Sequence, residues 1–254
     1  MPTRRLVFPG AHGHDLAARL EVPEGSDPTA FALFAHCFTC TKNLRAVVQV
    51  SRALCKEGFA VLRFDFTGLG ESEGDFADTN FSSNVSDLVA AGTFMEAEFE
   101  GPSLLVGHSL GGAAVLHATR SLPSVRAVAT IGAPSDPAHV LRHMEGYREE
   151  IERAGAATVS LGGRPFKVKR QFLEDLKESR MKWAVEGLGG ALLILHSPKD
   201  AIVGIENAAR LYQMARHPKS FVSLDDADHL LARERDSVYA GRLLAAWVSR
   251  YLEG

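Results

Sequence analysis

Cysteine is scarce in this chain, with three in 254 residues. Three cysteines cannot all pair with one another, and so few are typical of proteins from a reducing cytoplasm. Long apolar runs are also missing, since none approaches the roughly 18 residues of a membrane-spanning helix, and we expect no membrane span. The run Leu6–Phe8 follows two arginines as in a signal peptide, but it is too short for the apolar core of one.

The chain has little excess charge of either sign. Its 28 Lys and Arg residues nearly balance 31 Asp and Glu residues, for a formal net charge of −3. This balance gives no reason to expect nucleic acid or an anionic membrane as a partner. Hydrophobic residues make up 46% and charged residues 23%, as in soluble globular enzymes, and the length suits one large domain or two small ones.

Strand and helix patterns alternate along the chain. Apolar runs predict strands at about 3–8, 15–22, 31–36, 60–66, 103–108, 126–132, 191–196 and 220–224. Periodic apolar residues predict helices at about 42–57, 83–99, 110–120, 204–216 and 236–252. The turn Pro9–Gly13 indicates that the first two strands form a hairpin. The alternation predicts an α/β fold: an eight-stranded, mostly parallel sheet with helices on both faces.

One segment departs from this alternation. Residues 137–189 lie between two predicted strands that a single helix would connect. The segment contains two helical stretches with a hairpin between them, at Val140–Ala154, 157–168 and Arg170–Val185. We interpret residues 137–189 as a lid inserted over the carboxyl edge of the sheet, and residues 1–136 and 190–254 as the core domain.

The stretch Gly107–Gly112 carries the most specific motif of the chain. It has the pattern G-x-S-x-G around Ser109, between a predicted strand and a predicted helix. A strand that turns sharply into a helix forces its central residue into a strained conformation, and small neighbours allow the close approach. The N-terminus of the helix then places its N–H groups beside the serine oxygen. This pattern predicts that Ser109 is a nucleophile, provided a base lies nearby.

An acid and a histidine follow Ser109 in the expected order. Asp200 lies in the loop that follows the predicted strand at 191–196, and His229 lies in the loop after the last strand. Ligands of such folds bind at the carboxyl ends of the strands, where all three residues lie. We predict that His229 takes the proton of Ser109 and that Asp200 orients the imidazole. Asp136 also follows a strand and is the alternative acid.

Attack by Ser109 would place negative charge on the carbonyl oxygen, which requires two N–H donors. One is the backbone N–H of Leu110, directly after the nucleophile. The other is expected from the loop after the third strand, His36–Cys40, where Phe38 is the candidate. We interpret His36 itself as a structural residue that hydrogen-bonds within this loop.

Two further motifs are interpreted as structural. Cys37 and Cys40 have the C-x-x-C spacing of redox and metal sites, but there is no second pair. We therefore expect two small, half-buried thiols, and we expect Cys55 to be core. The glycine-spaced loop Asp65–Gly74 resembles a phosphate cradle, but no Lys-Ser/Thr follows it and no helix opens directly from it. A tight loop bordering the active site is the favoured interpretation.

The segment 137–189 offers candidates for substrate binding. Four of its aromatic residues are expected to face the substrate: Tyr147, Phe166, Phe172 and Trp183. More than half of its apolar residues are expected only to pack the segment onto the sheet. Ten Lys and Arg against seven Asp and Glu over residues 139–185 would attract an acidic substrate, although a solvated helix face explains this excess equally well.

Together these residues resemble the α/β-hydrolase superfamily over nearly the whole chain. The Asp65–Gly74 loop and the Gly107–Gly112 turn are similar to those of small serine esterases, including feruloyl esterases with a hairpin-bearing lid. Five stretches resemble the hydrolase half of bacterial proteins fused to an OsmC-type hydroperoxide-reductase domain: His36–Arg45, Arg63–Val89, Gly107–Leu116, Ala127–His139 and Ser160–Asp175.

This resemblance implies Ser109, Asp200 and His229 as the catalytic triad, with Phe38 and Leu110 forming the oxyanion hole. Many relatives have His-Gly where this chain has His36-Cys37. The chain also lacks the OsmC-type domain, so we expect either a stand-alone relative or one half of a longer parent protein. No peroxidase activity is implied.

We predict a serine carboxylesterase that acts on small or aryl esters, without a cofactor or metal. The same machinery would serve a thioesterase or a small-peptide hydrolase. The alternative from a different class of function is a non-catalytic module that supports a redox partner. We expect a cytoplasmic protein, with a homodimer as one candidate oligomeric state. The acyl and alcohol groups are left open, because a fold does not fix the substrate.

Overall fold

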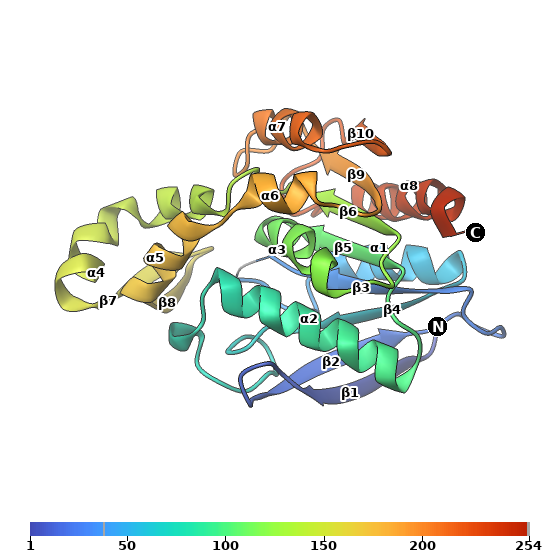
Figure 1. Ribbon diagram of the computed structural model, residues 1–254, viewed down its shortest axis with the longest axis horizontal. Helices are drawn as coiled ribbons and strands as arrows, with labels where there is room; N and C mark the ends of the chain where they lie inside the picture. The colour runs from blue at the N-terminus through green and yellow to red at the C-terminus, as the bar shows by residue number, and fades with distance from the viewer. Residues whose placement is uncertain (38, 253–254) are drawn as a thin grey trace.

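An eight-stranded sheet forms the centre of the computed structural model, which describes residues 1–37 and 39–252. Its strand order is β1-β2-β4-β3-β5-β6-β9-β10 (Figure 1). β2 runs antiparallel to both of its neighbours, and the strands from β4 to β10 are parallel. The bounds are β1 Thr3–Pro9, β2 Asp15–Glu21, β3 Ala30–Ala35, β4 Phe59–Phe64, β5 Leu104–His108, β6 Ala127–Ile131, β9 Ala191–His196 and β10 Lys219–Ser223. The predicted α/β fold with a mostly parallel sheet is confirmed.

Helices cover both faces of this sheet. α1 (Arg45–Lys56) and α8 (Glu234–Leu252) pack on one face, whereas α2 (Phe81–Glu98), α3 (Leu110–Ala118) and α7 (Glu206–Met214) pack on the other (Figure 1). Each agrees with its predicted helix to within about three residues. Short 3₁₀ helices occur at Phe76–Asp78 and Thr119–Ser121. No helix within 1–37 and 39–252 is long and apolar enough to cross a membrane.

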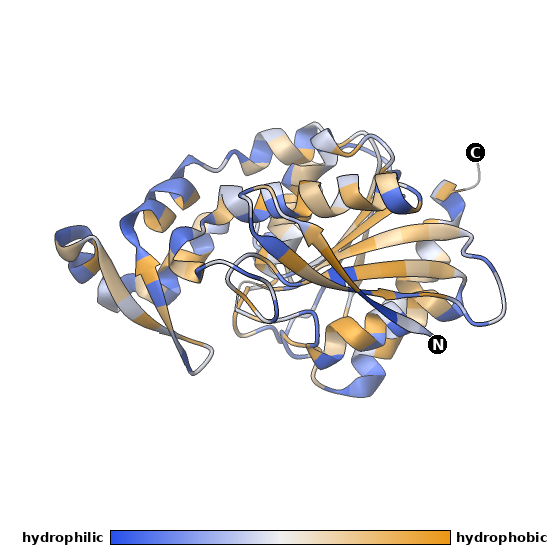
Figure 2. Ribbon diagram, turned by 90° about the horizontal axis from the view of Figure 1, so that it is seen from below, coloured by the Kyte–Doolittle hydropathy of each residue, from blue (hydrophilic) through white to orange (hydrophobic). Residues whose placement is uncertain are grey.

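Each central strand contributes to two separate cores. In β3 the side chains of Phe31 and Leu33 join the cluster under α2 and α3, while Ala32 and Phe34 join the cluster under α1 and α8. This division follows from the two-residue period of a strand, which sends successive side chains to opposite faces. The central strands are accordingly mostly hydrophobic, whereas the helices carry hydrophilic residues on their outer faces (Figure 2). This burial on both faces holds the strand ends in fixed positions.

The inserted segment, residues 137–189, leaves the sheet after β6 and returns at β9. It contains a 3₁₀ helix (η3, Pro137–Tyr147), α4 (Arg148–Ala154), the hairpin of β7 (Ala156–Leu161) and β8 (Arg164–Lys169), α5 (Arg170–Glu178) and α6 (Met181–Glu186). The hairpin prediction is confirmed. Both long helices of the prediction are interrupted, because the first begins as a 3₁₀ helix and Ser179 adopts an extended conformation (ψ 130°) between α5 and α6. In Figure 1 the hairpin and α4 extend beyond the end of the sheet.

The structure corrects the interpretation of Cys37 and Cys40. The two residues form a disulfide rather than two free thiols. The N–H of Cys40 donates to the carbonyl of Cys37 (3.0 Å), and this turn brings the two Cα atoms within 5.3 Å, a separation that suits a disulfide. Cys55 is buried as predicted, and burial raises the pKa of its thiol to about 12. Cysteine number alone therefore gave the wrong expectation for the pair.

Candidate active site

Ser109 lies in the sharp turn between β5 and α3. Its backbone has φ 54° and ψ −125°, in the left-handed half of conformational space that side chains seldom adopt. Two hydrogen bonds hold this conformation: the N–H of Ser109 donates to Ile131 O, and the N–H of Gly112 donates to Ser109 O, both over 2.8 Å. The residue therefore has the geometry of a nucleophile elbow, with α3 beginning at Leu110.

Three glycines make this turn possible. A Cβ on Gly107 would lie 2.4 Å from the carbonyl oxygen of Gly111, and a Cβ on Gly111 would lie 2.4 Å from the carbonyl oxygen of His36. A Cβ on Gly112 would lie 2.6 Å from the Cβ of Ala133. The strand, the helix and the loop after β3 thus approach one another more closely than any side chain allows. The glycine spacing of the motif follows directly from this packing.

His229 and Asp200 meet at the same edge of the sheet. Asp200 follows β9 and His229 follows β10, and their parallel pairing brings the two loops together. His229 Nδ1 lies 2.7 Å from Asp200 Oδ2, while Asp200 Oδ1 accepts from the N–H groups of Ile202 (2.9 Å) and Val203 (2.8 Å). The carboxylate is held from both sides, so it fixes the orientation of the His229 ring.

Burial opposes ionisation of Asp200, but the hydrogen bonds from His229 and from the two backbone N–H groups outweigh it. As a result the pKa of Asp200 lies below its usual value, and the carboxylate is charged at neutral pH. Asp136, the alternative acid, is exposed and accepts the N–H of Ala138 (2.9 Å) as the N-cap of η3. The geometry therefore pairs His229 with Asp200.

Two residues that support this pair were not predicted from the sequence. Gly132 has φ 57°, and a Cβ there would lie 3.1 Å from Asp200 Oδ2 and 3.3 Å from His229 Nδ1. His108 Nε2 lies 2.7 Å from the carbonyl oxygen of His229 and holds the histidine loop against β5. Their only sequence signal is that each comes at or just after the end of a central strand.

His108 makes stability depend on pH. Burial, and then the charge of His229, lower the pKa of His108 from 6.5 to about 3. Between these values the unfolded chain binds a proton that the folded protein does not, so stability is complete above pH 6.5 and falls as the pH is lowered. At about pH 5 this group alone should cost ~2 kcal/mol of the free energy of unfolding.

Urea unfolding at about pH 8 and about pH 5 measures this loss. In the His108→Gln variant the difference between the two pH values should shrink by ~2 kcal/mol, whatever the substitution costs at either pH. An undiminished difference in the variant would show that His108 does not carry the effect.

A buried ion-pair network holds the loop after β3, and sequence analysis missed it. The ammonium group of Lys42 has no exposed surface and pairs with Asp65 and with Glu71, the latter over 2.6 Å. Asp65 Oδ1 also accepts the N–H of Lys42 (2.7 Å), and Arg63 donates to the carbonyl of Lys42. A Cβ on Gly70 would lie 2.1 Å from Asp65 Oδ2, so the glycine-spaced loop closes around a carboxylate.

The structure describes one of the two predicted oxyanion donors. Leu110 is the first residue of α3 and lines the cavity beside Ser109. Phe38 lies outside the described residues. His36 is fully buried and its Nδ1 lies 2.7 Å from the carbonyl oxygen of Cys37, the structural position predicted for it. Burial lowers the pKa of His36, so the ring is uncharged at neutral pH.

A cavity of about 580 Å³ contains both Ser109 and His229. The loop after β3 forms one wall, and the inserted segment forms another through η3 and the β7–β8 hairpin. Apolar side chains supply much of the lining: Leu44, Leu110, Val140, Leu161, Ile202, Val203 and Leu230. A cavity of this size accommodates a small organic substrate beside the serine.

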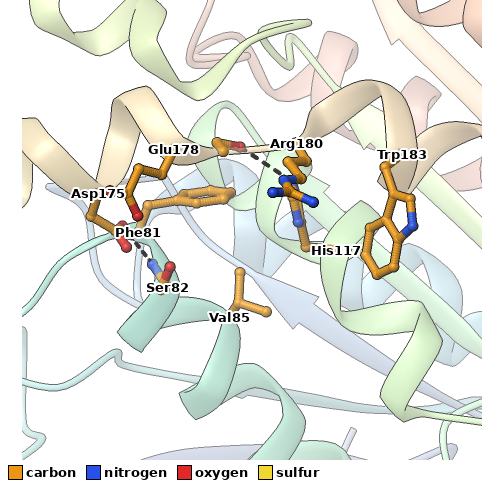
Figure 3. A pocket seen from close by; sticks show the side chains of 9 residues that line it. Phe81, Ser82, Val85, His117, Asp175, Glu178, Arg180 and Trp183 are labelled. Carbon is orange, nitrogen blue, oxygen red and sulfur yellow. Dashed lines mark hydrogen bonds between the residues drawn. The ribbon is translucent and has the colours of Figure 1, made fainter.

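The four aromatic residues predicted to face the substrate are not among the described residues that line this cavity. Phe172 is buried in the core, Phe166 packs on Phe76 with ring centroids 4.8 Å apart, and Tyr147 packs against the same core. Trp183 lies on α6 beside a different cavity of about 350 Å³, which Phe81, His117, Asp175 and Arg180 also line (Figure 3). The two cavities share no described residue.

Comparison with known proteins identifies the family. Residues 32–242 match the family model described as "Alpha/beta hydrolase family". The mitochondrial palmitoyl-protein thioesterase ABHD10 of Mus musculus is 26% identical over 204 residues, covering 76% of this chain and 67% of its own length. Its counterpart in Rattus norvegicus is 30% identical over 170 residues, covering 65% of this chain and 52% of its own. This chain thus spans between half and two thirds of these relatives.

Two solved structures share the fold of this chain. The esterase domain of a Rhodothermus marinus protein is 53% identical, with a TM-score of 0.81 and coverage of 99% of this chain and 100% of that chain. Est1E from Butyrivibrio proteoclasticus, solved with ferulic acid bound, has a TM-score of 0.81 at 18% identity and covers 98% of this chain. At that identity the likeness to Est1E concerns the fold alone.

Proposed function

Because this chain belongs to the alpha/beta hydrolase family, we propose that it is a serine hydrolase that cleaves carboxylic esters through an acyl-enzyme on Ser109. One observation carries the proposal: Ser109 and His229 line one cavity, and His229 Nδ1 lies 2.7 Å from the buried carboxylate of Asp200. The Rhodothermus marinus esterase domain, 53% identical, supports the same reaction class.

In the first half of the reaction, Ser109 Oγ attacks the carbonyl carbon while His229 Nε2 takes the hydroxyl proton. Asp200 holds the Nδ1–H tautomer, which leaves Nε2 free to accept, and stabilises the imidazolium that forms. When the tetrahedral intermediate collapses, the carbon–oxygen bond to the alcohol breaks. His229 returns its proton to the departing alkoxide, and the acyl group remains on Ser109.

In the second half, water replaces the alcohol. His229 takes a proton from water as it attacks the acyl carbon, and Ser109 Oγ leaves with that proton. In both halves the negative charge on the carbonyl oxygen needs N–H donors already in place. The N-terminus of α3 at Leu110 supplies one, and we propose that Phe38 supplies the other. The buried Lys42–Asp65 pair anchors the loop after β3 at Lys42.

We further propose that the inserted segment acts as a lid that selects the substrate. It contributes Val140, Leu161 and Gly162 to the cavity, while the sheet contributes the serine turn and the histidine loop. The sheet residues act on the carbonyl group common to all esters. Discrimination must therefore come from the walls that contact the rest of the substrate. This role falls to η3 and the β7–β8 hairpin rather than to the four aromatic residues named from the sequence.

Thioester hydrolysis is the second candidate. Two of the relatives are described as palmitoyl-protein thioesterases, and the same serine chemistry cleaves an acyl–sulfur bond. The cavity near Ser109 has an apolar lining that suits an acyl group of moderate length.

Three butanoyl compounds test the proposal: an aryl ester, an alkyl thioester and an anilide. We expect turnover of the ester or the thioester by the parent protein, and no turnover above the uncatalysed rate by the Ser109→Ala variant. The ratio of kcat/KM between ester and thioester decides between the two candidates. No turnover of any of the three by folded parent protein would contradict the proposed function.

Four expectations from the sequence stay proposals. The cytoplasmic location rests on low cysteine content, and the Cys37–Cys40 disulfide weighs against a reducing compartment. The link to an OsmC-type domain in a longer parent protein rests on the sequence resemblance, and a homodimer stays one candidate oligomeric state. Independence from metals and cofactors follows from the proposed chemistry, which needs only protein groups.

A further inference from the structure

The cavity at Ser109 has an unbalanced charge. Among its described lining residues there is no Asp or Glu, and one side chain, Arg164, carries a permanent positive charge. The other polar groups of the lining include hydroxyls and an amide, which can donate hydrogen bonds: Thr39, Thr41, Asn43 and Ser160. A cavity with donors, one cation and no carboxylate is complementary to an anion.

Arg164 is held in place from two sides. It follows the Gly162–Gly163 turn of the β7–β8 hairpin, where both glycines have positive φ. Its guanidinium donates to the carbonyl of Thr39, in the loop after β3, and lies over the ring of Phe166 at 5.3 Å from the centroid. The bond to Thr39 uses one of the five N–H groups of a guanidinium. A guanidinium group anchored in this way can bind a carboxylate at a defined position through its remaining N–H groups.

Two histidines add hydrogen-bonding groups to the cavity. His139 and His143 line the cavity on η3, with ring centroids 6.2 Å apart. His139 Nε2 lies 2.9 Å from the carbonyl oxygen of Ile202 and therefore donates to it. Burial, and then the nearby His139, lower the pKa of His143, so this ring is neutral at pH 7. The one permanent positive charge among the described lining residues, that of Arg164, matches an anion of one negative charge.

We propose that this cavity binds esters that carry a carboxylate remote from the bond that is cleaved, with Arg164 as the residue that recognises the carboxylate. This inference rests on the proposed ester hydrolysis at Ser109 and names its substrate class. Arg164 acts on substrate choice and takes no part in the chemistry at the carbonyl. Its loss should therefore affect anionic and neutral esters differently.

Lys167 provides a matched control on the same strand. It lies three residues after Arg164, so it points from the opposite face of β8, and it is not among the described lining residues of the cavity. It is exposed, like Arg164. The substitutions Lys167→Gln and Arg164→Gln each remove one positive charge from the hairpin. A difference between them isolates direct contact from general attraction by a basic surface.

Two pairs of esters serve as probes. In the first pair the acyl group carries the charge: 4-nitrophenyl hydrogen adipate against 4-nitrophenyl methyl adipate. In the second pair the leaving group carries it: 4-butanoyloxybenzoate against its methyl ester. For each protein variant the measured quantity is the kcat/KM of the charged ester divided by that of its neutral partner, so intrinsic reactivity cancels when variants are compared.

We expect Arg164→Gln to lower this ratio about tenfold in one of the two pairs, as loss of a charge-assisted hydrogen bond at a partly exposed site would. Lys167→Gln should leave both ratios unchanged. The neutral esters report whether the Arg164 variant is still folded and active. The pair that responds shows which side of the ester carries the carboxylate.

Equal ratios in the parent and in Arg164→Gln, for both pairs, would overturn the inference, and so would an equal loss in Lys167→Gln. These results are distinct from failure of the proposed function. In that case neither the charged nor the neutral esters would be cleaved by the parent protein faster than by the Ser109→Ala variant.

Discussion

Replacing Ser109 by alanine should lower kcat on an activated aryl ester by roughly 10⁴–10⁶. The variant keeps the cavity, the His229–Asp200 pair and the N–H of Leu110, but it has no oxygen to form the acyl-enzyme. The stability of the folded state should change little. Alanine and serine both carry a Cβ, so the steric cost of the positive φ (54°) at this position is the same for both. Steady-state kinetics with highly purified variant protein measures the loss.

Ser249→Ala is the matched control for this variant. It removes a hydroxyl from the exposed surface of α8, where the serine donates to Ala246 O. Its kcat should equal that of the parent. If Ser109→Ala retained kcat within about tenfold of the parent, transition-state stabilisation would not depend on the serine and the mechanism would be wrong.

The second large effect is expected from Asp200→Asn, which should lower kcat by roughly 10³–10⁴. In the parent, Asp200 Oδ1 accepts two backbone N–H groups and Oδ2 faces His229 Nδ1. An asparagine would keep its carbonyl oxygen toward the two N–H groups, so its NH₂ would face His229. Nδ1 would then have to accept, and the proton would move to Nε2. That tautomer cannot take the proton of Ser109.

Asp136→Asn is the control, because Asp136 is the alternative acid and undergoes the same substitution. Asparagine is a good N-cap, so the 3₁₀ helix η3 should be retained and activity should change little. Kinetics of both variants, with circular dichroism to show that they fold, measure the contrast. A larger loss from Asp136→Asn would assign the acid to the β6 loop instead.

The sequence predicted those parts of the molecule that depend on local pattern. The glycine spacing around Ser109 predicted a sharp turn, because each glycine is a position where a Cβ would collide with backbone or with Ala133. The order of strands predicted that the loops of Asp200 and His229 would meet, since parallel strands end at one edge of a sheet. The pairing of His229 with Asp200 rather than Asp136 needed coordinates, because both loops lie at that edge.

Contacts between residues far apart in the chain could not be predicted from the sequence. Lys42 and Asp65 are 23 residues apart and form a fully buried pair, and nothing in their local sequence indicates burial of a lysine. His108 and Gly132 contact the His229 loop from the ends of two neighbouring strands. The inserted segment was the least predictable part. Its apolar pattern does not say which side chains face the cavity. The four aromatic residues expected to contact the substrate lie elsewhere, while Val140 and Leu161 line the cavity.

Labelling by a fluorophosphonate tests the central claim most directly, because this reagent phosphonylates only a serine that an adjacent base activates. Intact-protein mass spectrometry followed by peptide mapping should find one adduct per chain, on Ser109. The adduct should be absent from Ser109→Ala and strongly reduced in His229→Ala. Labelling at another serine, or folded parent protein that stays unlabelled, would contradict the account.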